Sequence, residues 1–243
     1  MKWIAVLAAA LAPMAASAYV TTGGKWGNTV MGTGATITWS LMPTGTDCSV
    51  GEGTGCTIKA LDDFMPAGYL TELQNAFNAW SAVANLTFVQ VSDNGSNEAN
   101  AFGKFGNIRI GGHLFDGPSG VLAHAYIPPG PYYDVPYGFL GDVHFDQEEA
   151  WTVGTSGFEI FNVFVHELGH SLGLYHTDVP GSLMNPYYTT AFQGPQTDDI
   201  AGMRAIYGAA VTPADVPEPS SLALVGLAVC VLGWRRHASG RAA

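Results

Sequence analysis

Three histidines and one glutamate lie close together with the types and spacing of a catalytic metal site. His166 and His170 are four residues apart, so on a helix they project from one face and can bind the same ion. Gly173 allows the chain to leave that helix, because glycine tolerates the left-handed conformation, and His176 can then return to the ion. Three neutral imidazoles leave a fourth position open to water, which is the catalytic arrangement, and Glu167 could accept a proton from that water. The alternative is a helix on which histidines occur by chance.

Helices must position these ligands. Ser156 and Glu159 form a Ser-x-x-Glu capping box that predicts the start of the ligand helix. Its apolar face comprises Phe161, Phe164, Val165, Leu168 and Leu172. An amphipathic helix is predicted over 67–84, and a last helix is predicted to begin with Thr197 as its cap and to end at Gly208.

Alternating apolar residues predict strands at 35–41, 86–91 and 107–110, with shorter candidates at 121–127 and 142–145. We therefore expect an α+β fold with a twisted mixed sheet of about five strands and two long helices. A small C-terminal subdomain should follow His176, with the cleft between the two parts.

Met184, eight residues after His176, extends the histidine pattern to one that resembles the metzincin clan. Leu183-Met184-x-Pro186-x-Tyr188 and the segment 198–208 resemble the matrixins, the family of the matrix metalloproteinases, and the likeness covers about residues 35–208.

The resemblance implies that His166, His170 and His176 bind zinc, that Glu167 is the general base, and that Met184 forms a hydrophobic floor beneath the metal. It also implies substrate contacts: Pro186 and Tyr188 form a pocket wall, and a rim strand with Leu122 and Ala123 pairs with an extended peptide.

The same resemblance implies two further metal sites. His124 and His144 match ligands of a structural zinc, and Asp116, Asp146 and Glu149 match ligands of a calcium ion. The family's other two zinc ligands would fall at Arg109 and Gly111, which cannot serve. Either His113 acts as a third ligand, or the second zinc is absent and these histidines are hydrogen-bonded loop residues.

Both ends of the chain have the patterns of processing segments. Residues 1–18 carry a lysine, an apolar run and a small-residue triplet, which predict a secretory signal peptide cleaved before Tyr19. Residues 209–219 read as a linker, and 216–243 combine Pro-Glu-Pro, an apolar stretch and two arginines. This pattern resembles the PEP-CTERM sorting tail of Gram-negative bacteria, which implies an exosortase as partner, transient membrane anchoring and a location in the cell envelope or outside it. The alternative is an ordinary C-terminal anchor.

Charge and cysteines limit the remaining possibilities. Between Tyr19 and Glu218, five basic residues stand against 20 acidic ones (5 − 20 = −15), so no nucleic-acid partner is expected. Cys48 and Cys56 are close in the exported part, where a disulfide persists; free thiols, or one thiol masking the zinc, are the alternatives.

These features predict a secreted zinc endopeptidase that hydrolyses peptide bonds in a protein or peptide substrate through a zinc-activated water, with Glu167 as general base. The alternative is a non-catalytic, metal-stabilised structural or adhesive component of an extracellular matrix. The presence of Glu167 favours the enzyme.

Overall fold

The computed structural model describes residues 18–96, 104–131, 138–154 and 157–211. Internal contacts divide the chain into residues 1–210 and 211–243, and the fold and sites described below belong to the first unit. The predicted signal peptide, apart from Ala18, and the apolar part of the predicted tail lie outside the described residues. Within the described ranges, no helix is long and apolar enough to cross a membrane.

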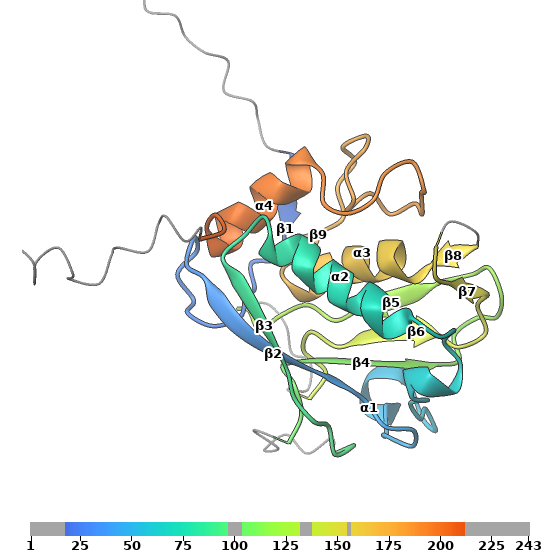
Figure 1. Ribbon diagram of the computed structural model, residues 1–243. Helices are drawn as coiled ribbons and strands as arrows, with labels where there is room; N and C mark the ends of the chain where they lie inside the picture. The colour runs from blue at the N-terminus through green and yellow to red at the C-terminus, as the bar shows by residue number, and fades with distance from the viewer. Residues whose placement is uncertain (1–17, 97–103, 132–137, 155–156, 212–243) are drawn as a thin grey trace, which may run out of the picture. The chain divides into compact units, whose positions relative to one another are not determined.

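A five-stranded mixed sheet forms the centre of the domain, with the order β3-β2-β4-β6-β5 (Figure 1). Its strands are β2 (Ala35–Leu41), β3 (Leu86–Gln90), β4 (Ile108–His113), β5 (Ala123–Ala125) and β6 (Val143–Asp146). All neighbours pair in parallel except β5, which lies antiparallel to β6 at the edge. The expected mixed sheet is confirmed.

Two helices, α2 (Tyr69–Ser81) and α3 (Ile160–Ser171), lie side by side over the sheet (Figure 1). Phe77 of α2 joins the layers, because its ring centroid lies 4.8 Å from that of Trp39 on β2 and 5.3 Å from that of Phe164 on α3. The side chains of Phe77 and Phe164 are fully buried. Contacts of this kind fix α3, and therefore its histidines, relative to the sheet.

The last part of the domain contains α4 (Thr197–Tyr207), which ends at Gly208 as predicted. The remaining elements are short: α1 (Ser49–Glu52), the 3₁₀ turn η1 (Leu61–Asp63), β1 (Val20–Thr21), β7 (Trp151–Thr152), β8 (Phe158–Glu159) and β9 (Leu174–Tyr175). Strand β1 pairs with β9, so the beginning of the described chain packs beside the segment that carries the third histidine.

Two predicted helix starts were wrong. Glu159 is the N-cap of α3 and not its third residue, so the predicted capping box does not form, and Ser156 lies outside the described residues. The Glu159 carboxylate instead accepts a hydrogen bond from the side chain of Asn162, at 2.8 Å. Thr197 is the first residue of α4; the cap is Gln196, which forms a capping box with Asp199.

Candidate metal centres

The side chains of His166, His170 and His176 converge at one point. The Nε2 atom of His176 lies 3.2 Å from Nε2 of His166 and 3.1 Å from Nε2 of His170. Nitrogen ligands about 2.0–2.1 Å from a tetrahedral zinc ion would stand about 3.3 Å apart. The three nitrogens therefore fit a zinc ion with little adjustment.

Backbone carbonyls fix which nitrogen of each ring faces the shared point. The Nδ1 atom of His166 lies 2.7 Å from the carbonyl oxygen of Leu183, and that of His170 lies 3.0 Å from the oxygen of Leu174. Because a carbonyl only accepts, each Nδ1 carries the proton and each Nε2 keeps its lone pair for a metal. Burial lowers the pKa of His166 to about 4 and that of His170 to about 3, so both rings are neutral at pH 7.

Gly173 turns the chain towards the third ligand. Its φ of 110° lies in the left-handed region, which favours glycine. A Cβ at this position would also stand 2.6 Å from the carbonyl oxygen of Gly24. The backbone angle and the close approach of Gly24 therefore both require glycine at position 173, between α3 and β9. His176 follows directly after β9.

Glu167 lines a cleft of about 500 Å³ together with His166 and His176. The cleft is also lined by the four residues predicted to contact substrate, Leu122, Ala123, Pro186 and Tyr188. Burial by itself raises the pKa of Glu167 to about 8. A bound cation beside the carboxylate opposes that shift, because it favours the ionised form.

Met184 is buried under α3, where its sulfur packs so closely against Gly169 that a Cβ there would lie 2.5 Å from it. The carboxylate of Asp199 holds the turn before it, because it accepts hydrogen bonds from the backbone N–H groups of Leu183 at 2.7 Å and Met184 at 3.1 Å. The turn that presents the Leu183 carbonyl to His166 is thus fixed by α4.

A second cluster brings together His113, His124 and His144, with ring centroids between 5.1 and 5.8 Å apart. His113 therefore joins the two histidines expected from the family pattern. Arg109, which stands at the position of a family ligand, instead forms a buried ion pair with Asp93, with Nε 2.8 Å from the carboxylate.

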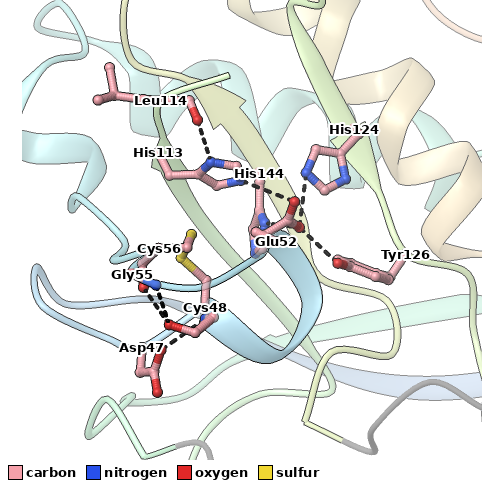
Figure 2. Close-up of a disulfide and its surroundings, with 11 residues drawn as sticks. Asp47, Cys48, Glu52, Gly55, Cys56, His113, Leu114, His124, Tyr126 and His144 are labelled. Atoms are coloured by element: carbon pink, nitrogen blue, oxygen red, sulfur yellow. Dashed lines mark hydrogen bonds and ion pairs between the residues drawn. A yellow bond between two sulfur atoms is a disulfide. The ribbon is translucent and has the colours of Figure 1, made fainter. Parts of the chain in front are cut away.

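Glu52 completes this second cluster and was missed from the sequence (Figure 2). Its carboxylate oxygens lie 3.1 Å from Nδ1 of His144, 3.2 Å from Nε2 of His124 and 3.6 Å from Nε2 of His113. Burial opposes ionisation of Glu52, but the nearby rings of His124 and His144 outweigh it and lower the pKa of the carboxyl group. Over the described ranges, this cluster and the three histidines of the cleft are the two groups able to hold a metal ion.

The three predicted calcium ligands do not form such a group. Asp116 accepts a hydrogen bond from the backbone N–H of Val121 at 3.0 Å, and Glu149 accepts one from Ser119 at 2.6 Å. One carboxylate oxygen of Asp146 is buried with no hydrogen-bond partner. The calcium site stays a prediction.

A helix that carries two histidines and a glutamate, followed by a glycine turn to a third histidine, defines a metzincin-type zinc site. The model of the family described as Matrixin matches residues 56–208, and that of the PEP-CTERM protein-sorting motif matches residues 215–236. The chain therefore belongs to the matrixin family of zinc metalloendopeptidases. The resemblances to the matrixins and to a PEP-CTERM tail are both confirmed.

Curated relatives agree with this assignment. The hatching enzyme of Paracentrotus lividus is 45% identical over 141 residues, which cover 56% of this chain and 22% of the relative. Human matrix metalloproteinase-20 is 42% identical over 141 residues (56% and 27%), and human neutrophil collagenase is 36% identical over 185 residues (68% and 38%). The chain thus spans less than half the length of each of these relatives.

Proposed function

We propose that this chain is an exported endopeptidase that hydrolyses internal peptide bonds of protein substrates at the His166, His170 and His176 site. The observation that carries the proposal is the convergence of three Nε2 atoms beside a cleft that Glu167 also lines. When bound there, zinc would supply a Lewis acid that polarises a carbonyl group and acidifies water.

Glu167 is the proton carrier in this proposal. Its carboxylate takes a proton from the attacking water and gives it to the leaving amine. His166 and His170 are held by the carbonyls of Leu183 and Leu174, so the ligands need no reorganisation when the substrate binds.

The substrate is an extended peptide in the same proposal. Strand β5 is the edge of the sheet, so the rim at Leu122 and Ala123 offers backbone groups to a further strand. Pro186 and Tyr188 line the same cleft as this rim and supply part of its apolar wall. Binding through the backbone suits cleavage within a chain rather than at its ends.

Export and sorting form the second part of the proposal. Residues 1–18 act as a signal peptide, 19–208 form the enzyme domain, 209–219 link it to the tail, and 216–243 direct the chain to the envelope. The PEP-CTERM match at 215–236 supports processing by an exosortase-type enzyme. Mass spectrometry of the exported protein should find Tyr19 at the N-terminus; an intact Met1 would contradict the assignment.

The catalytic proposal is tested by Glu167→Ala. We expect cleavage of an unfolded protein to fall about 10²- to 10⁴-fold, the usual contribution of a general base, with zinc content unchanged. Glu72→Ala on α2, which does not line the cleft, is the matched control and should retain full activity. A zinc-loaded Glu167→Ala protein with undiminished activity would refute the assignment.

A further inference from the structure

The loop between Cys48 and Cys56 places one side chain, that of Glu52, against three histidines that come from β4, β5 and β6 (Figure 2). We propose that this loop is a ligand arm: Glu52 is the fourth ligand of a closed zinc site with His113, His124 and His144, and the disulfide holds that ligand in place. The inference goes beyond peptide hydrolysis, because metal retention at this site does not depend on catalysis.

The nitrogen atoms of the cluster indicate a metal rather than a set of hydrogen bonds. The Nε2 atoms of His113 and His124 are buried and have no hydrogen-bond partner, although buried polar atoms are normally paired. Both face the Glu52 carboxylate, as does Nδ1 of His144 at 3.1 Å. His124 Nε2 is 3.2 Å from the Glu52 carboxylate without the geometry of a hydrogen bond. One ligand atom from each of the four residues lies within 4.8 Å of the others, which is the arrangement that a shared metal ion would explain.

The donor set suits zinc. Imidazole and carboxylate are both zinc ligands, and four protein ligands make the closed, structural type of site. The carboxylate also lowers the net charge of a buried Zn²⁺ site from +2 to +1, which reduces the cost of burial. His113 is held for this role, because its Nδ1 lies 2.9 Å from the carbonyl oxygen of Leu114.

The local structure of the loop serves to present Glu52. Helix α1 is a single turn, in which the backbone N–H of Glu52 donates to the Cys48 carbonyl at 2.9 Å. One turn of helix is unstable alone. The disulfide supplies the missing constraint, since Cys48 is buried against Met42, Ile58 and Phe139.

The turn of α1 lies unusually close to the neighbouring loop. A Cβ on Gly51 would collide with the Tyr126 hydroxyl and would stand 3.1 Å from the ring of Phe139. The same hydroxyl donates a hydrogen bond to Glu52 at 2.8 Å (Figure 2). Tyr126 therefore orients the carboxylate, in the way that outer groups orient metal ligands.

The segment that follows the loop is also joined to the strand that carries His113. The backbone groups of Lys59 and Gly112 exchange two hydrogen bonds, at 2.6 and 3.0 Å. Three connections, the disulfide, the Tyr126 hydroxyl and this bridge, thus fix a ligand that is 92 residues from His144 in the chain.

The experiment counts zinc in the full chain carrying Glu167→Ala, which separates this inference from the catalytic proposal. Elemental analysis should give two zinc ions per chain, and one after Glu52→Gln. After reloading with zinc, release to a chromogenic chelator should be at least about 100-fold faster from the second site of Glu52→Gln, because even outer groups contribute 10- to 100-fold to affinity. Glu72→Gln is the matched control and should behave as the parent.

The role of the disulfide is tested by Cys48→Ser/Cys56→Ser. Opening a short loop should weaken zinc retention at the second site about 10- to 100-fold while the zinc of the cleft stays bound, which also shows that the domain is folded. The proposal would be overturned by any of three results: one zinc in the parent, two slowly released zincs in Glu52→Gln, or unchanged release from the double serine variant. If Glu52→Gln does not fold, Tyr126→Phe replaces it: faster release supports the proposal and unchanged release refutes it.

Discussion

Asp199 should contribute to zinc affinity although it lies outside the cleft. Its buried carboxylate accepts hydrogen bonds from the Ser182 hydroxyl, from the N–H groups of Leu183 and Met184, and from Gln196 N–H at 2.8 Å. Leu183 in turn accepts the Nδ1 proton of His166 at 2.7 Å. One carboxylate therefore connects the cap of α4 to the orientation of a zinc ligand.

The size of the effect follows from what Asp199→Ala would leave behind. The backbone N–H of Leu183 would lose its partner, at a cost of about 1–3 kcal/mol, whereas that of Met184 would keep the Ser182 hydroxyl at 3.1 Å. Loss of the capping box adds about 1 kcal/mol. The free energy of unfolding should thus fall by about 2–4 kcal/mol, a substantial part of the 5–15 kcal/mol that is usual for a domain. Zinc affinity should fall about 10- to 100-fold.

Urea unfolding of the chelated Glu167→Ala protein measures the first quantity, and competition with a chelator measures the second. Asp198→Ala is the matched control, because Asp198 is the preceding residue of α4 and makes no contact with the Met184 turn in the hydrogen bonds described. It should change stability by less than about 1 kcal/mol. If Asp199→Ala behaves like Asp198→Ala in both assays, the carboxylate does not position His166.

Three further outcomes are expected. Gly173→Ala should lower stability by more than about 1 kcal/mol and weaken zinc binding, since its Cβ would meet the Gly24 carbonyl; normal zinc affinity would contradict the assigned turn. The pKa values of His144, His166 and His170 in the folded protein lie far below 6.5. In chelator-treated Glu167→Gln protein, lowering the pH from 7.5 to 5.5 should therefore reduce the free energy of unfolding by about 1.3 kcal/mol for each of these rings. The reason is that the unfolded state binds the protons first. A flat urea-midpoint profile would contradict the buried neutral state. Glu52→Gln should raise KM for an unfolded protein more than it lowers kcat, and an effect on kcat alone would refute that expectation.

Local patterns were sufficient for most of the fold. Strand β2 has the predicted bounds, and β3 and α2 differ from prediction only at their ends, because alternation and helical spacing reflect one buried face. The predicted start of α3 was wrong because a capping box requires a helical backbone between its two residues, which the sequence pattern alone does not guarantee. Glu159 belongs to β8 and has extended φ and ψ angles, so the helix begins one residue later.

The two metal centres differ in how far apart their ligands lie in the chain. The cleft site is readable from the sequence because a helix spacing and one glycine turn determine its geometry. Glu52 is 92 residues from His144, and no periodicity connects them. Alignment with the family pattern also placed a ligand at Arg109, but Arg109 forms a buried ion pair with Asp93. An acidic residue in a disulfide loop gives no sign of a ligand until the loop is placed.

The second cluster adjoins the rim on which the peptide is proposed to bind, so a metal ion held there would have a function in the enzyme. Ala123 lines the cleft, and the next residue, His124, points into the cluster, where it pairs in register with His144 of β6. Strand β5 has three residues and one neighbour, so its ladder alone holds the edge weakly. A metal ion shared by His124, His144 and Glu52 would cross-link this edge to the sheet and to the disulfide loop. The oxidised loop would then stiffen the strand on which the peptide is expected to pair, without any contact with the substrate.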